Sequence, residues 1–237
     1  MEASGYTTLT RQTGLLREMR MVANNIANAA TTGYRSEGLL FSEHVRRTDG
    51  GPSLSMARGN TPLTSREQGP LEETGGRFDF AIEGDGYFLI ETPEGERLTR
   101  SGAFSLSAAG DLVNADGYRL LDAGGAPVFV PPDATAPGLA ADGTLSSDGR
   151  PLAQLGLYRP AGDGPPIRAG GNLLEARDGI EPVVDGRIIQ GFLEGSNVEP
   201  VSEIARLIEV QRAYEMGQSF LETEDRRVRT AIDTLTR

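Results

Sequence analysis

Apolar positions near the start of the chain follow a helical repeat. They are spaced seven residues apart, with Met19 and Ile26 between them: Leu9, Leu16, Ala23 and Ala30. This alternating three- and four-residue spacing is typical of a helix that packs against another helix. Gly33 can adopt the left-handed conformation that ends helices. We therefore expect an amphipathic helix within residues 1–33.

A second, longer repeat occupies the end of the chain. Pro200 suits the first turn of a helix, where its missing N–H costs nothing. The apolar positions that follow alternate by three and four residues, with Glu224 as a charged interruption: Leu207, Val210, Tyr214, Gly217, Leu221, Val228, Ala231 and Leu235. No proline interrupts residues 201–237. We expect residues 193–237 to form a long amphipathic helix that needs a partner.

The middle of the chain has a different pattern. Short apolar runs, such as residues 78–82 and 87–91, alternate with Asp-Gly pairs, which favour tight hairpin turns. These pairs begin at Asp49, Asp85, Asp116, Asp142, Asp148, Asp163, Asp178 and Asp185. We expect a β-rich central domain of antiparallel strands over residues 77–192, and an irregular connector over 34–76, where periodicity is weak. The predicted fold class is α+β, with the terminal helices pairing as a coiled coil.

Composition limits the classes of partner and location that we expect for this chain. The 237 residues carry a formal net charge of −11, which disfavours nucleic acid as a partner. No stretch has the roughly 20 apolar residues needed to cross a bilayer, so direct membrane insertion is not expected. The first residues lack the basic and apolar regions of a cleaved signal peptide, so export would need another route.

Candidate catalytic groups are few. There is no cysteine, and His44 is the only histidine. Gly84 and Gly86 begin a possible nucleotide-binding pattern, but Leu89 stands where the third glycine should be. We expect no catalytic residues, no metal, no cofactor and no enzymatic activity.

The first helix contains three asparagines, Asn24, Asn25 and Asn28, although asparagine disfavours helix. Their amides can form hydrogen bonds across a close helix contact, next to small alanines. We expect the repeat of Leu9, Leu16, Ala23 and Ile26 to face that of Leu207, Tyr214, Leu221 and Val228. The candidate assembly interface joins both sets with the asparagines, Val210 and Gln211.

Several motifs together resemble the flagellar rod and hook protein family. Residues 24–28 (Asn-Asn-Ile-Ala-Asn) with 31–35 (Thr-Thr-Gly-Tyr-Arg) resemble its N-terminal signature, and residues 208–215 its C-terminal one. Residues 80–88 and 98–104 resemble the start of the central domain of the rod members. Residues 220–229 are more similar to the proximal-rod members than to the distal-rod paralogue.

The resemblance implies a structural subunit of the bacterial flagellar basal body. Its terminal helices would pair in the inner tube of the rod, and its partners would be itself and other rod proteins. It would leave the cytoplasm through the flagellar type III export apparatus and lie in the periplasmic rod. The alternatives are a soluble module that binds a peptide or glycan, the distal-rod paralogue and, third, a peptidoglycan hydrolase.

Overall fold

The computed structural model describes residues 2–46, 54–134, 136–162, 166–184 and 186–235. The chain forms two compact units, each assembled from separate stretches of sequence. The first unit contains Met1–Ala27, Glu37–Ser65 and Glu199–Arg237, and the second contains Asn28–Ser36 and Arg66–Val198. The expected α+β class, with two terminal helices flanking an antiparallel β region, is confirmed.

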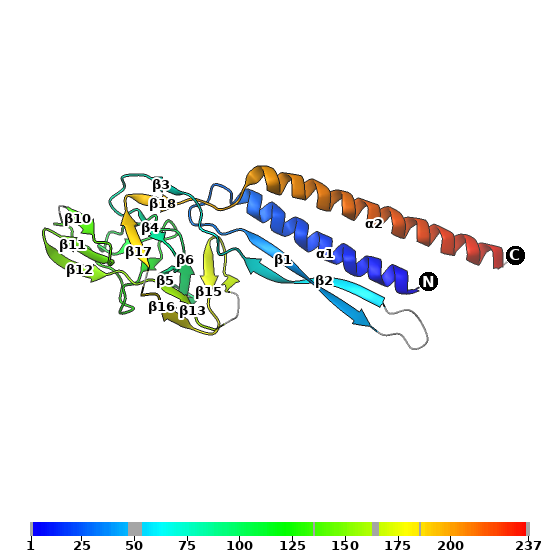
Figure 1. Ribbon diagram of the computed structural model, residues 1–237, viewed down its shortest axis with the longest axis horizontal. Helices are drawn as coiled ribbons and strands as arrows, with labels where there is room; N and C mark the ends of the chain where they lie inside the picture. Colours follow the sequence, from blue (N-terminus) through cyan, green and yellow to red (C-terminus); the bar gives the residue numbers. More distant parts are fainter. Residues whose placement is uncertain (1, 47–53, 135, 163–165, 185, 236–237) are drawn as a thin grey trace. The chain divides into compact units, whose positions relative to one another are not determined.

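The first unit is built from two helices and a long hairpin (Figure 1). Helix α1 (Glu2–Ala27) runs antiparallel to α2 (Pro200–Leu235), which begins at the proline that the sequence indicated. Strands β1 (Glu37–Arg46) and β2 (Leu54–Thr64) pair antiparallel, from Glu37 opposite Thr64 to Arg46 opposite Leu54. Helix α1 contacts α2 and both strands, so it lies between the second helix and the hairpin.

The hairpin differs from the sequence-based expectation. Residues 34–76 were expected to be an irregular connector, but they contain β1, β2 and the short strand β3 (Leu71–Glu73). The reason is physical: β1 and β2 are stabilised by pairing with each other and by contact with α1, which local periodicity does not reveal. The predicted turn at Asp49-Gly50 lies outside the described residues.

The second unit consists of short strands joined by tight turns. Strands β14-β15-β6-β5-β9-β8-β7 form a seven-stranded sheet, β10-β11-β12 a smaller one, and β13-β16, β17-β4 and β18-β3 form pairs. The remaining strands are β4 (Phe80–Glu83), β5 (Phe88–Thr92), β6 (Gly95–Thr99), β7 (Ser105–Leu106), β8 (Leu112–Val113), β9 (Arg119–Leu120), β10 (Pro137–Leu139), β11 (Thr144–Ser147), β12 (Arg150–Gln154), β13 (Tyr158–Pro160), β14 (Ile167–Arg168), β15 (Leu173–Glu175), β16 (Ile180–Pro182), β17 (Arg187–Gln190) and β18 (Phe192–Glu194). All the pairings between named strands are antiparallel, as expected.

Asp-Gly turns connect some of these strands, as the sequence predicts. Between β11 and β12, Asp148 and Gly149 both have positive φ angles, 51° and 75°, and Ser147 pairs with Arg150. Two consecutive positive φ angles define the turn that matches the twist of a two-residue hairpin. The predicted turn at Asp163-Gly164 lies outside the described residues, and so does Asp185 of the turn predicted at Asp185-Gly186.

The core of the second unit is apolar and well enclosed. Phe80, Phe88 and Phe104 are buried, and the rings of Phe88 and Phe104 meet edge to face with centroids 5.7 Å apart. Aliphatic side chains from β4, β5, β8, β9, β11 and β17 complete this core. The second unit therefore has its own hydrophobic core, of the kind that lets a domain fold independently.

Candidate assembly interface

Two polar contacts fix the register of the helix pair. The Gln12 side-chain amide donates to the Tyr214 carbonyl at 2.9 Å, and the Arg206 guanidinium pairs with the Glu18 carboxylate at 2.9 Å. Gln12 precedes Glu18 in α1 whereas Tyr214 follows Arg206 in α2, so the helices run in opposite directions. This pairing places α1 beside the N-terminal two thirds of α2.

The predicted α2 repeat faces α1. Val210 is the most enclosed side chain in the described part of α2, with 6% exposure, and Leu207, Tyr214 and Leu221 are half-buried. Gly217 lies against α1, because a Cβ there would come within 2.0 Å of the Gln12 amide nitrogen. Glycine at this position of the repeat leaves room for the Gln12 side chain.

The predicted α1 repeat does not face α2 within the chain. Leu9 is 56% exposed, Leu16 is 37% exposed and Ala23 is also exposed; Ile26 is half-buried. The expectation that the first three pack on α2 is therefore wrong. Because α1 contacts both α2 and the hairpin, its buried residues are spread over a wider part of the helix surface: Gln12, Glu18, Met21, Val22 and Asn25.

The asparagines of α1 also differ from expectation. Asn25 is buried, and its side chain forms two hydrogen bonds with the backbone of Glu37, the first residue of β1, at 2.9 and 3.0 Å. Asn28 accepts a hydrogen bond from the Thr31 hydroxyl, and Asn24 is exposed. Asn25 thus binds the hairpin rather than the other helix, so the prediction of an amide contact between helices is wrong for it.

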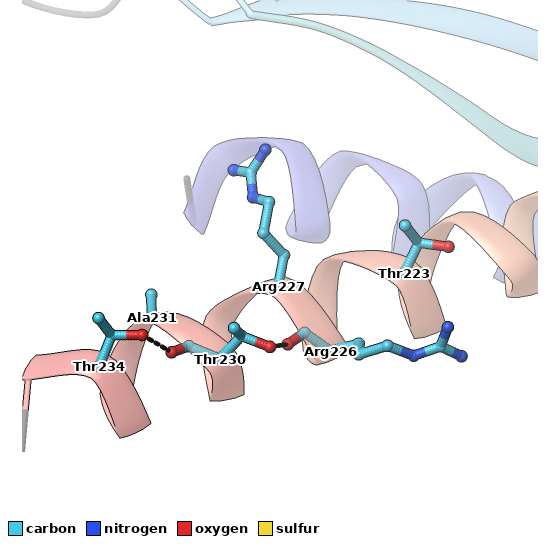
Figure 2. A pocket seen from close by; sticks show the side chains of 6 residues that line it. All are labelled: Thr223, Arg226, Arg227, Thr230, Ala231 and Thr234. Atoms are coloured by element: carbon cyan, nitrogen blue, oxygen red, sulfur yellow. Dashed lines mark hydrogen bonds between the residues drawn. The ribbon is translucent and has the colours of Figure 1, made fainter.

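The C-terminal end of α2 carries an exposed apolar stripe. Val228, Ile232 and Leu235 are 42%, 54% and 87% exposed, and Gln211, nearer the middle of the helix, is also exposed. The same end of the helix carries a shallow groove lined by Thr223, Arg226, Arg227, Thr230, Ala231 and Thr234 (Figure 2). The Thr230 and Thr234 hydroxyls donate to carbonyl oxygens of their own helix. These two hydroxyl groups therefore form hydrogen bonds within α2, and the surface of the groove is mainly apolar.

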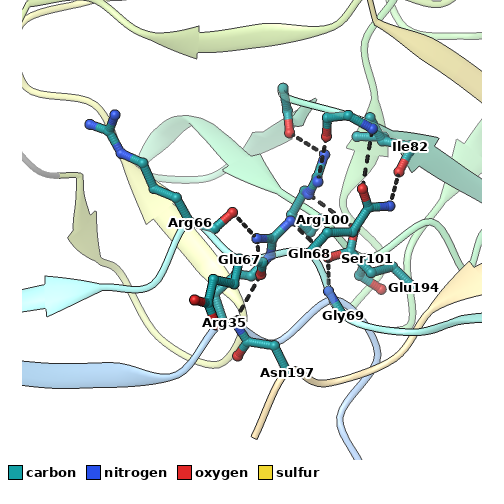
Figure 3. A network of polar contacts seen from close by, with 12 residues as sticks. Arg35, Arg66, Glu67, Gln68, Gly69, Ile82, Arg100, Ser101, Glu194 and Asn197 are labelled. Atoms are coloured by element: carbon teal, nitrogen blue, oxygen red, sulfur yellow. Dashed lines mark hydrogen bonds and ion pairs between the residues drawn. The ribbon is translucent and has the colours of Figure 1, made fainter.

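A buried carboxylate organises the second unit. Glu194, at the end of β18, is fully buried, and its carboxylate lies 2.8 Å from Arg35 and 3.0 Å from Arg100 (Figure 3). The backbone N–H of Gly69 donates to the same carboxylate at 3.1 Å. We call these four residues the Glu194 cluster. Burying one carboxylate with two guanidinium groups is tolerated because the charges are paired and hydrogen-bonded.

The arginines of the Glu194 cluster also bind backbone carbonyls. Arg35 donates to the carbonyls of Arg66 and Glu67, and Arg100 donates to those of Gly84 and Gly86. Burial lowers the pKa of the Arg100 guanidinium, while the neighbouring Glu194 carboxylate opposes that change. The cluster therefore ties together chain segments that are distant in the sequence.

Asn197 extends the same polar network. Its side-chain oxygen accepts from the Ser36 N–H at 2.7 Å, and its amide nitrogen donates to the Glu67 carbonyl at 2.8 Å. Ser36, Arg66 and Val198 are three of the four residues at which the chain enters or leaves the second unit. The sequence contained a partial signal for this network, since Arg35 and Arg100 both lie in the family-like motifs. Their common partner Glu194 could not be inferred from periodicity.

Metal binding and membrane insertion each require particular arrangements of residues. Across the part of the chain that the structure describes, no group of three or more His, Cys, Asp or Glu residues is arranged to hold a metal ion. Neither described helix combines the length and apolar character needed to cross a membrane. The described features are helix faces that pack together or stay exposed, and polar side chains that bind distant segments of the chain.

Comparison with known proteins identifies the class. The family model for flagella basal body rod protein matches residues 6–35, the hook protein FlgE/F/G D1 domain model matches 81–147, and the basal body rod FlgEFG C-terminal model matches 189–234. These three matches cover the first helix, the front of the β unit and the last helix. They define a structural protein of the flagellar axis.

Full-length relatives identify the family more closely. The chain is 40% identical to the flagellar basal-body rod protein FlgF of Mesorhizobium japonicum and 36% identical to FlgF of Caulobacter vibrioides, each over 99% of this chain and 98% of the relative. It is 28% identical to FlgG of Bacillus subtilis, over 95% and 96%. The chain belongs to the flagellar basal-body rod protein family and is most similar in kind to FlgF. It is a structural subunit of the basal body, and not an enzyme.

Proposed function

We propose that the chain is a subunit of the proximal rod, and that it joins itself and other rod proteins through its two terminal helices. The supporting observation is the exposure of regularly spaced apolar side chains on helices that are already paired. Leu9 and Leu16 on α1, and Val228 on α2, remain exposed after the helices have packed together. Exposed apolar surface of this kind marks sites of protein–protein contact.

The proposed interface consists of the predicted residues, sorted by their position in the structure. Those facing outward supply contacts to neighbours: Leu9, Leu16, Ala23, Asn24, Gln211 and Val228. The others are enclosed or half-buried, and they would act by stabilising the structure around the exposed residues rather than by direct contact: Asn25, Ile26, Asn28, Leu207, Val210, Tyr214 and Leu221. Assembly through the first group would leave the second unit unchanged.

The proximal position is supported by the FlgF relatives, whose identity to the chain is higher than that of the Bacillus FlgG. Export by the flagellar type III apparatus and a periplasmic location follow from the family resemblance. The proposal therefore includes this export route and this location. The binding-module alternative is not favoured by the relatives, which are named as rod proteins along their full length.

The test compares two substitutions of exposed apolar residues by aspartate. Leu16→Asp places a charge on α1, and the matched control Val184→Asp places one on an exposed residue of the second unit. Both should change the free energy of unfolding by no more than about 0.5 kcal/mol, because surface substitutions rarely do more. Leu16→Asp should abolish incorporation into rods and swimming motility, and Val184→Asp should retain both. Normal rods with Leu16→Asp would contradict the proposed interface.

Leu221→Asp provides a second test from the other helix. Leu221 is half-buried on the face of α2 that carries the repeat, so its charge should prevent assembly while the second unit stays folded. Retention of the fold is measured from tyrosine fluorescence, because Tyr34, Tyr87, Tyr118 and Tyr158 lie in that unit. Rods that contain Leu221→Asp at normal levels would show that the repeat has another role.

A further inference from the structure

The segment between α1 and β1 belongs to the second unit. It consists of residues 28–36, hereafter the strap, which follow the end of α1 at Ala27 and precede the start of β1 at Glu37. The strap forms turns and contains no helix or strand. Connections of this kind normally run over the surface of a protein, yet residues 33–35 are buried. The strap is therefore more than a connection.

Two distant elements of the second unit bind the backbone of Thr32 and Gly33. The Asn172 side-chain amide donates to the Thr32 carbonyl at 2.9 Å, and the Gly33 N–H donates to the Glu194 carbonyl at 2.7 Å. Asn172 lies between β14 and β15, whereas Glu194 is the last residue of β18. Neighbouring residues of the strap thus join parts of the unit that are far apart in the sequence.

The next three residues of the strap are bound in the same way. Asn197 accepts from the Ser36 N–H through its side chain at 2.7 Å and donates its own N–H to the Tyr34 carbonyl at 3.3 Å. The Arg168 guanidinium donates to the Arg35 carbonyl at 2.7 Å. Hydrogen bonds to the backbone of successive residues are a general means of recognising a peptide segment.

The side chains of the strap add sequence specificity. Tyr34 is fully buried, and the Arg168 guanidinium lies over its ring, 4.3 Å from the centroid. Gly33 has a φ angle of 67°, and a Cβ there would come within 2.3 Å of a backbone nitrogen of the second unit. Arg35 belongs to the Glu194 cluster (Figure 3). The site therefore selects glycine, tyrosine and arginine in succession.

We propose that the second unit contains a peptide-binding site, and that its ligand is the segment Thr32–Arg35 (Thr-Gly-Tyr-Arg) of the strap. Because the ligand is part of the same chain, its effective concentration is high and the site stays filled. Release of the strap would take Arg35 away from the buried Glu194 carboxylate, so the second unit needs its ligand to be stable. This inference is independent of assembly through the helices, since the site and its ligand lie within the second unit.

Two alanine variants of the full chain test whether the second unit needs the strap. Gly33 and Gly75 have the same φ angle of 67°, so alanine meets the same backbone strain at both positions. At Gly75 a Cβ would have nothing within 4 Å, whereas at Gly33 it would collide with the backbone of the site. Gly33→Ala should therefore speed the hydrogen exchange of β15 amides at least about tenfold more than Gly75→Ala does, with helix content unchanged. Equal exchange in the two variants would overturn the inference.

A synthetic peptide of residues 28–36 tests recognition directly. The recipient is the full chain with both Gly33→Ala and Tyr34→Ala, whose own strap binds poorly. Excess peptide should slow the exchange of β15 amides in this variant by about tenfold, because ligand binding stabilises the folded state. A peptide with Tyr34→Ala should have no effect. Failure of the first peptide would show that the strap acts only as a covalent linker, and equal action of both peptides would show that the site does not select tyrosine; either result overturns the inference.

Arg168→Met provides the test if Gly33→Ala prevents folding. It removes the guanidinium that binds the strap carbonyl and covers the Tyr34 ring, but it keeps an apolar stem of similar length. The amides of the strap should exchange at least about tenfold faster than in the parent chain. The control is Arg187→Met, which removes an exposed guanidinium elsewhere in the second unit. Strap exchange that is the same in both variants would contradict the proposed site.

Discussion

The two units of this protein bury their side chains to different extents. In the second unit, aromatic and aliphatic residues such as Phe80, Phe88 and Leu120 are fully enclosed, and even the carboxylate of Glu194 is paired out of solvent. In the first unit, Val210 is the only buried residue in the described part of α2, while Ile204, Ile208 and other large apolar residues of that helix are exposed.

This difference indicates that the two units have different roles. A unit with a closed core gains most of its stability within one chain. A helix pair with exposed apolar faces gains more when other helices cover those faces. The first unit is therefore suited to assembly, and the second can keep its fold whether or not neighbours are present.

The largest expected effect comes from removing the buried carboxylate. Glu194→Gln leaves Arg35 and Arg100 buried without their counter-charge, so the free energy of unfolding should fall by about 3–5 kcal/mol. Urea denaturation followed by tyrosine fluorescence measures it. The control is Glu181→Gln, which removes an exposed ion pair with Arg159 and should cost less than about 1 kcal/mol. Equal stability of the two variants would contradict the closed character of the second unit.

Hydrogen exchange compares the two units in one experiment. Backbone amides of β4 and β5 should exchange at least about a hundredfold more slowly than those of α2 after Glu224, because buried core strands open only in large-scale unfolding. The measurement uses the monomeric full chain at low concentration, and mass spectrometry of peptides reads each element. Strong protection of the end of α2 under these conditions would show that it needs no neighbour.

The sequence predicted the elements whose signals are local. The repeat of α2 and its starting proline, the type of the Asp148-Gly149 turn and the antiparallel β region all depend on residues close in the chain. The hairpin of β1 and β2 was missed because its stability depends on α1, and the α1 face was assigned wrongly for the same reason: two partners pack on that helix.

The same limit applies to the candidate site. Leu207 and Tyr214 of the predicted interface are half-buried on α2, and Gln12 of α1 binds the Tyr214 carbonyl. Asn25 was assigned to a helix contact although it binds the start of the hairpin. Glu194 was missed entirely, because its partners Arg35 and Arg100 come from distant parts of the chain.

A medium effect is expected where the Gln12 side chain packs over Gly217. Gly217→Leu would place a bulky side chain where the Gln12 amide now lies and would break its bond to Tyr214. Overpacking of this kind should weaken the helix pair by about 1–3 kcal/mol. The loss is measured from the thermal transition of the helical circular dichroism signal. Gly217→Ala is the control, since the flexible end of Gln12 can move and the gain in helix propensity of about 1 kcal/mol offsets the contact. A transition unchanged by leucine would place Gly217 outside the contact.

The smallest effect concerns an exposed turn of the second unit. The Asp142 carboxylate accepts a hydrogen bond from the Thr144 N–H at 2.9 Å, and its bonds to Thr144 lower the pKa of Asp142 from its ordinary value of 3.8. The folded state therefore favours the ionised carboxylate. Its stabilisation is complete above the ordinary pKa and is lost as the pH falls through the lower pKa of the folded state.

Asp142→Ala should therefore slightly lower the free energy of unfolding near neutral pH, and this difference from the parent should shrink as the solution is acidified below 3.8. Urea denaturation near neutral pH and again below pH 3.8 measures this difference in the free energy of unfolding. The control is Asp133→Ala, at an exposed residue. A constant difference at both pH values would show that the alanine acts through backbone propensity and not through the carboxylate. A difference that disappears on acidification would show that this turn of the second unit is stabilised by a carboxylate bond within one chain.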